Sequence, residues 1–140
     1  MGFDEFGLVN FVPFTKVSDF TKHLKEGKLK GMHCKKCNTT YFPPRAECVK
    51  CLAPESEMEW FEYSGKGKLL TYTTIHAAPT GFETKVPYTI GVVDLEEGGR
   101  LLAWVEDPPE DETQLRLGAE VLIEPKMIDD DRLIYMIKLI

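Results

Sequence analysis

The sequence has few of the features that membrane and secreted proteins carry. No apolar run in its 140 residues approaches the roughly 20 residues that a helix needs to cross a bilayer. The first 14 residues are apolar and aromatic, but they include Asp4 and Glu5 and no basic residue, so a signal peptide is not expected. We therefore expect a cytoplasmic protein without a membrane partner, in which thiols stay reduced.

Groups that commonly carry out catalysis are also scarce. The only histidines are His23, His33 and His76, and no Ser or Cys has a plausible base to activate it, because all four cysteines belong to the cluster discussed below. A glycine-rich phosphate loop of the Walker or Rossmann type is absent as well. These absences predict a protein that is not itself a catalyst.

Charge is present in abundance but is unevenly distributed. Residues 16–50 contain nine Lys or Arg against three acids, whereas residues 51–140 contain eight basic residues against eighteen acids. A basic N-terminal half on a chain of net charge −6 could meet an anionic ligand or an acidic partner surface. The alternative is that these lysines only keep a small module soluble.

A short amphipathic helix is predicted before Gly27. Ser18 is a suitable N-cap, Phe20 and Leu24 lie one turn apart on the same face, and Gly27 can end the helix in the left-handed conformation. The preceding residues 1–14 either fold back on the domain or dock into a partner, and they are rich in phenylalanine: Phe3, Phe6, Phe11 and Phe14.

Five β-branched and aromatic runs follow in the C-terminal part and predict strands. Gly98 and Gly99 predict a tight hairpin, and Asp129 to Asp131 predict a turn. Pro125 lies inside a run and predicts an edge position or a bulge there. Residues 107–114 are expected to form a polar loop. Five such strands predict a small antiparallel barrel of the OB-fold type, with a split sandwich as the alternative. The runs are 69–75, 88–95, 101–105, 121–127 and 133–139.

All four cysteines fall within eighteen residues in the pattern C-x2-C-x10-C-x2-C. Two residues between paired cysteines let both thiolates converge on one ion, and four thiolates complete a tetrahedral shell. A complete shell leaves no position for water, so the pattern predicts a structural ion, zinc before any other. The ligands are Cys34, Cys37, Cys48 and Cys51.

Other interpretations of the cysteine cluster are weaker. Disulfides would require an oxidising compartment, which nothing else in the sequence indicates. Iron could occupy the same four thiolates, as in rubredoxin, although rubredoxins usually have glycine after each pair and this chain has Asn38 and Leu52 there. Iron stays open as an alternative ion. His33 adjoins Cys34 but is surplus to a complete shell.

A series of motifs along the chain resembles the acyl-CoA-associated family that joins an N-terminal helix, a rubredoxin-like zinc ribbon and a C-terminal OB-fold. The resemblance implies a mainly β chain with an N-terminal extension and helix in 1–28, a zinc ribbon in 29–55 and an OB-fold domain in 56–140. The motifs are Gly27-Lys28-Leu29, Tyr41-Phe42-Pro43-Pro44-Arg45 between the cysteine pairs, Gly65-Lys66-Gly67-Lys68-Leu69, Pro87-Tyr88-Thr89-Ile90-Gly91 and Gly118.

Within that family the chain resembles the small subunit of the archaeal acetoacetyl-CoA thiolase/hydroxymethylglutaryl-CoA synthase complex. The resemblance implies a non-catalytic scaffold that bridges these two enzymes in the mevalonate pathway, so that acetoacetyl-CoA is consumed as it forms. An accessory role with another thiolase or an acyl-CoA hydratase is the alternative, and the short chain without a fused enzyme segment favours the free-standing subunit.

Five residues are candidate contacts to CoA or to a partner. Lys28, Lys30 and Arg45 carry charges that suit phosphate oxygens or an acidic surface. His76 opens a loop over 76–86, where we expect an exposed Phe82; an ordinary mobile loop is the alternative.

Two further functional classes receive less support from the sequence. Zinc ribbons and OB-folds both recur in nucleic-acid-binding proteins, but the acidic balance of residues 51–140 opposes a phosphate backbone, so no nucleic acid partner is expected. An independent thioesterase would rest on the CoA association alone, without a base and a nucleophile.

Overall fold

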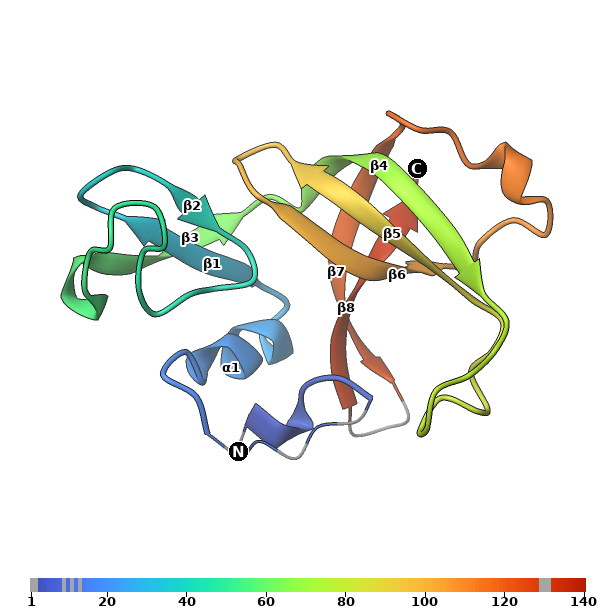
Figure 1. Cartoon of the computed structure of the whole chain (residues 1–140), viewed down its shortest axis with the longest axis horizontal. Helices are drawn as coiled ribbons and strands as arrows, with labels where there is room; N and C mark the ends of the chain where they lie inside the picture. Colours follow the sequence, from blue (N-terminus) through green and yellow to red (C-terminus); the bar gives the residue numbers. More distant parts are fainter. Residues whose placement is uncertain (1–2, 9, 11, 13, 129–131) are drawn as a thin grey trace.

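Short strands dominate the chain, and the predicted mainly β fold with a short N-terminal helix is confirmed (Figure 1). The computed structural model describes residues 3–8, 10, 12, 14–128 and 132–140, so Phe11 and the predicted turn at Asp129 to Asp131 lie outside the described residues. No helix within these ranges has the length and apolar character that a membrane span requires. In order, the elements are η1 (Phe3–Glu5), α1 (Asp19–Lys25), β1 (Leu29–Cys34), β2 (Thr40–Tyr41), η2 (Glu55–Glu57), β3 (Met58–Tyr63), β4 (Lys66–Ile75), β5 (Tyr88–Leu95), β6 (Arg100–Glu106), η3 (Glu112–Gln114), β7 (Glu120–Ile128) and β8 (Arg132–Leu139).

The five predicted C-terminal strands form a closed barrel in the order β4-β5-β6-β8-β7, which agrees with the OB-fold and not with a split sandwich. Neighbours pair antiparallel except β6 and β8, and β4 closes on β7 over only Lys66 to Lys68. Pro125 of β7 lies outside the short stretch that pairs with β4. Its lack of an N–H therefore removes no hydrogen bond between β7 and β4. Alternate residues point inward, as period-2 strands require, and form the barrel core: Leu69, Val93, Leu95, Leu101, Ala103, Val105, Val121, Ile123, Leu133 and Ile137.

A second, three-stranded sheet, the ribbon sheet, has the strand order β2-β1-β3 and carries the cysteine pairs at one end. β3 follows the predicted domain boundary at 55/56 and pairs with β1 over six residues. Gly31 of β1 permits the close packing of this sheet, because a Cβ there would collide with the Tyr41 carbonyl oxygen and lie 2.7 Å from Cε1 of Tyr63. The predicted boundaries themselves stay a prediction.

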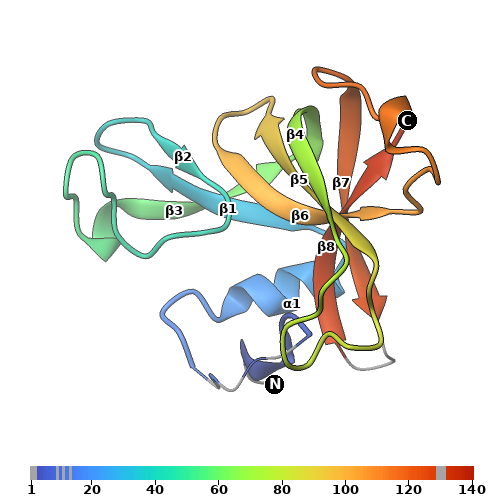
Figure 2. The same cartoon turned by 45° about the vertical axis from the view of Figure 1, so that its right-hand side comes forward.

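Helix α1 joins the ribbon sheet to the barrel through an aromatic cluster (Figure 2). Phe20 and Leu24 are both buried, as predicted, and the Phe20 ring contacts those of Phe6, Phe42 and Tyr135 at centroid distances of 5.3, 5.8 and 6.2 Å. These rings come from the N-terminal segment, the ribbon and β8, so one cluster connects all three parts of the molecule.

The phenylalanine-rich N-terminal segment folds back on its own domain. Phe3 and Phe6 pack against the core, the Gly7 N–H donates to the Leu133 carbonyl at 2.7 Å, and Arg132 Nε donates to the Gly7 carbonyl at 2.6 Å. Phe14 is different, because 74% of its surface stays exposed.

Helix α1 begins and ends where the sequence predicts, but the expected capping hydrogen bond at its N-terminus is absent. Ser18 is the N-cap residue, yet its side chain makes no capping hydrogen bond, and Thr21 Oγ1 instead donates to the Ser18 carbonyl at 2.9 Å. Gly27 follows the helix with a φ of +78°, the left-handed conformation predicted for it.

The turn between β5 and β6 is held against the ribbon sheet, as Figure 1 shows. Gly98 and Gly99 lie in this turn, as predicted, both with positive φ. Thr40 Oγ1 donates to the Glu97 carbonyl at 2.9 Å, and Tyr63 Oη donates to the Gly98 carbonyl at 3.0 Å. The backbone N–H of Ser64 adds a 2.7 Å hydrogen bond to Oε2 of Glu97. The barrel and the ribbon are therefore tied together by this turn as well as by the aromatic cluster around Phe20.

Candidate metal centre

The four cysteine sulfurs gather at the end of the ribbon sheet, all within 4.8 Å of one another. Sγ of Cys34 lies 3.6 Å from that of Cys51, and Sγ of Cys37 lies 3.5 Å from that of Cys48. In a regular tetrahedron with metal–sulfur bonds of about 2.3 Å, the sulfurs would be about 3.8 Å apart. The thiols are free rather than joined in disulfides, and their spacing fits a single ion bound by all four.

The backbone of each cysteine pair forms a tight turn around the sulfurs. The Asn38 N–H donates to the Cys34 carbonyl at 2.8 Å, and the Cys51 N–H points to Cys48 Sγ at 3.5 Å. The residue after each pair is left-handed, with φ of 63° for Asn38 and 61° for Leu52. Asparagine tolerates this conformation, but for leucine it is costly, and 83% of the Leu52 side chain is exposed without compensating burial.

Tyr41 supports the thiolate form of one ligand, a role that the sequence pattern did not reveal. Its hydroxyl lies 3.3 Å from Cys48 Sγ, and this hydrogen bond is the main reason that the pKa of Cys48 falls to about 6. Burial instead raises the pKa of Cys51 to about 12. An ion held by all four sulfurs would take every one of them as thiolate. Since four thiolates complete a tetrahedral shell, an ion bound by all four would have a structural role. The ligand assignment and the choice of zinc over iron stay predictions.

Replacing Leu52 by Gly is expected to stabilise the metal-loaded chain by about 1 kcal/mol, because glycine adopts the left-handed conformation without the clash of a Cβ. Chemical denaturation at saturating zinc measures the change. Val49→Gly is the matched control: Val49 is an exposed residue of the same turn without a positive φ, so glycine there should destabilise slightly. Equal destabilisation by both substitutions would contradict the prediction.

The predicted contact residues do not form one site. Arg45, Phe82 and Lys28 line three separate grooves of about 440, 240 and 340 Å³. His76 is exposed at the start of its loop, and Lys30 lies on β1, where its charge contributes after burial to a lowered pKa of His23.

Phe82 is half-buried, contrary to the exposure expected from the sequence. Its ring packs against Tyr88 and Trp104, each at a centroid distance of 6.0 Å, and those two rings stack on each other at 4.4 Å. The loop between β4 and β5 is therefore anchored to the barrel by an aromatic contact that its own sequence does not indicate.

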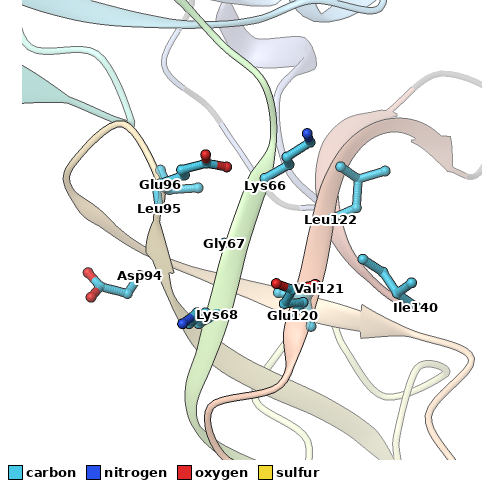
Figure 3. Close-up of a pocket in the computed structure, with 10 residues that line it drawn as sticks. All are labelled: Lys66, Gly67, Lys68, Asp94, Leu95, Glu96, Glu120, Val121, Leu122 and Ile140. Carbon is cyan, nitrogen blue, oxygen red and sulfur yellow. The ribbon is translucent and has the colours of Figure 1, made fainter.

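A larger groove, of about 760 Å³, runs along β4 between the end of β5 and β7 (Figure 3). Its charges are mixed, with Lys66 and Lys68 opposite Asp94, Glu96 and Glu120, and its lining includes no His, Cys or Ser. Nothing in this lining offers a nucleophile beside a base.

Comparison with known families finds two adjacent matches. Residues 21–57 match the family described as "ChsH2, rubredoxin-like zinc ribbon domain", and residues 60–124 match "ChsH2, C-terminal OB-fold domain". The first match covers β1 and β2 of the ribbon sheet, and the second covers most of β3 and the barrel strands β4 to β6 with the first part of β7.

Curated relatives include archaeal and bacterial proteins. A DUF35 domain-containing scaffold protein of Pyrococcus furiosus is 36% identical over 123 residues, which are 85% of this chain and 87% of that protein. A scaffold protein of the same description from Methanocaldococcus jannaschii is 46% identical over 92 residues, 64% of either chain and thus just under two thirds of that relative. Benzoylsuccinyl-CoA thiolase subunit BbsA of Thauera aromatica is 35% identical over 64% of this chain and 63% of its own length.

Solved structures show the same fold at lower identity. A chain of the structure titled "Ltp2-ChsH2(DUF35) aldolase" superposes with a TM-score of 0.74 at 20% identity, over 90% of this chain and 96% of that one. A DUF35-family protein of Sulfolobus solfataricus gives a TM-score of 0.60 at 22% identity, over 87% and 83% of the two chains. The arrangement of ribbon and barrel is thus shared with both.

Proposed function

Because the chain belongs to the DUF35 family, in which a rubredoxin-like zinc ribbon precedes an OB-fold domain, we propose that it is a non-catalytic scaffold subunit bridging acetoacetyl-CoA thiolase and hydroxymethylglutaryl-CoA synthase. The observation that carries the proposal is the 36% identity to a DUF35 scaffold protein along 85% of the chain. By holding the two enzymes together, the subunit would couple the formation of acetoacetyl-CoA to its consumption in the mevalonate pathway.

The chemistry of the described residues supports a scaffold rather than a catalyst. The four thiols are gathered in one cluster that suits a structural ion, and burial raises the pKa of the Tyr135 hydroxyl to about 12, so that group stays neutral and is a poor base. Burial also lowers the pKa of His23, whose ring packs edge-on against Trp60 at 4.9 Å in a structural contact. The proposal places the chain in the cytoplasm, where free thiols persist.

A second candidate keeps the scaffold role but changes the enzyme. The 35% identity to a benzoylsuccinyl-CoA thiolase subunit favours an accessory role in the complex of another thiolase. The two candidates differ only in which enzymes the chain joins.

Co-expression tests the proposal directly. The chain, the thiolase and the synthase of the source organism are produced together, and the assembly is measured by size-exclusion chromatography with mass detection. We expect all three to elute together, and the two enzymes to separate when the chain is omitted. A thiolase that binds the chain without the synthase would favour the second candidate, and a chain that elutes alone would refute the proposed bridge between these two enzymes.

A functional measurement complements the assembly test. In the three-component complex, the concentration of free acetoacetyl-CoA during turnover should stay below that of the two enzymes mixed without the chain, while hydroxymethylglutaryl-CoA forms faster. Equal concentrations in both mixtures would show that the chain does not couple the two steps.

A further inference from the structure

A groove of about 440 Å³ separates the ribbon from the turn between β5 and β6. The segment from Thr40 to Arg45 and Val49 form its ribbon wall, and Gly99 and Arg100 form its barrel wall. The groove therefore exists only because the two parts of the molecule are packed together.

The walls of this groove are fixed in place by hydrogen bonds that cross between the two parts. Thr40 donates to the Glu97 carbonyl at 2.9 Å and Tyr63 to the Gly98 carbonyl at 3.0 Å, immediately beside the lining residues Gly99 and Arg100. A Cβ at Gly98 would lie 2.7 Å from Thr40 Oγ1, so the turn approaches the ribbon as closely as glycine allows. A partner would meet a preformed surface, which reduces the entropy lost on binding.

Two exposed arginines give the groove its charge. The Arg45 guanidinium lies 5.9 Å from the centre of the Tyr41 ring, and Arg100 Nε lies 3.4 Å from Asp94 Oδ1. None of the described residues that line the groove is acidic, so the two guanidiniums with Asp94 behind them give a net charge of about +1. This charge suits a single carboxylate, which arginine binds through paired N–H donors, better than the several charges of a nucleotide diphosphate.

Apolar side chains lie beside these charges in the lining. Val49 has 60% of its surface exposed, and it lies with Pro43 and Pro44 next to Arg45. The centres of protein–protein interfaces are more apolar than the rest of the surface and are enriched in arginine.

From the charge and the apolar lining together, we propose that this groove docks a segment of a partner enzyme that carries a carboxylate next to an apolar side chain. The inference rests on the proposed scaffold function and adds to it the place and the chemistry of one contact. The carboxylate would pair with Arg45 and Arg100, and the apolar side chain would cover Val49.

Binding constants of zinc-loaded variants test the docking site. The chain is titrated separately against purified acetoacetyl-CoA thiolase and hydroxymethylglutaryl-CoA synthase. We expect Arg45→Glu and Arg100→Glu each to weaken binding to the same enzyme by at least about tenfold, with smaller losses for the Gln variants. Arg116→Glu, an exposed arginine on the loop before β7, is the matched control and should change binding less than about twofold. Zinc content and circular dichroism verify that each variant is folded.

A second titration separates failure of this inference from failure of the proposed function. The peptide acetyl-Glu-Leu-Glu-Leu-amide is added to the wild-type chain while NMR follows the arginine Nε–Hε signals. We expect the signals of Arg45 and Arg100 to shift and that of Arg116 to stay in place.

The outcomes distinguish the two ideas. If neither enzyme binds the wild-type chain, the proposed function is wrong, and the peptide titration alone decides whether the groove accepts carboxylates. Unchanged enzyme binding by both Glu variants would overturn the docking site. Stronger shifts of the same two signals with adenosine 3′,5′-bisphosphate than with the peptide would also overturn it, in favour of a nucleotide.

Discussion

Replacing Cys34 by Ala is expected to abolish metal binding, unfold the ribbon sheet and prevent complex assembly. Cys34 is fully buried at the end of β1, the central strand of that sheet. Structural zinc supplies about 10–16 kcal/mol to zinc-finger peptides, which is comparable to the whole stability of a typical domain at about 5–15 kcal/mol. Elemental analysis measures the ion, and hydrogen exchange measures protection of the β1 to β3 amides.

His33→Ala is the matched control for this loss. His33 immediately precedes Cys34, and its ring lies 6.0 Å from that of Phe61, but it is surplus to a shell of four sulfurs. This variant should retain one ion per chain and a protected ribbon. A Cys34→Ala chain that kept its ion and assembled its complex normally would contradict the prediction, and loss of the ion from both variants would place His33 among the ligands.

Replacing Phe20 by Ala is expected to destabilise the whole chain by about 3–5 kcal/mol. Only 2% of Phe20 is exposed, and its ring contacts Phe6, Phe42 and Tyr135 from three different parts of the molecule. Truncation would leave a cavity that no single element can close by moving. Chemical denaturation followed by tryptophan fluorescence measures the change in unfolding free energy.

Phe14→Ala makes the same substitution on a side chain that is 74% exposed, four residues before the α1 N-cap Ser18. It should change stability by less than about 0.5 kcal/mol. A similar loss in both variants would mean that the cost does not come from the buried cluster.

The barrel strands were predictable because their signals are local. β-branched and aromatic runs bounded by Gly98, Gly99 and Pro87 indicate where strands begin and turn, and each run became one strand of the barrel. The end of α1 at Gly27 was equally predictable, since a glycine just after an amphipathic helical segment predicts the left-handed conformation that is observed.

What could not be predicted depends on residues far apart in the sequence. Strand β3, which begins at Met58, is not among the five predicted runs, and its pairing with β1 across the cysteine segment has no local signal. Phe82 was expected to be exposed because nothing in its own loop covers it; the rings that do, Tyr88 and Trp104, belong to β5 and β6. The expected capping hydrogen bond from the Ser18 side chain is absent for a local reason. The Ser18 backbone is helical, at φ −57° and ψ −26°, whereas a capping residue needs an extended backbone.

The candidate sites were likewise predictable only where the signal is local in the sequence. The spacing of the four cysteines indicated one cluster, because two residues between ligands are enough to direct both sulfurs to a single point. Tyr41 and Arg100 gave no such signal. Their positions beside Cys48 and opposite Arg45 result from strand pairing and from packing of the barrel turn on the ribbon.

The hydrogen bonds from Thr40, Tyr63 and Ser64 to the β5–β6 turn bear on how a scaffold can accelerate transfer between enzymes. Partners joined by a flexible linker meet at an effective concentration that falls as the linker lengthens. Here the ribbon and the barrel are braced at two places, by this turn and by the Phe20 cluster, so enzymes bound to the two parts would keep one separation and one orientation. The gain in local substrate concentration would then be set by the span of a stiff body, and lengthening a loop such as 107–114 should leave it unchanged.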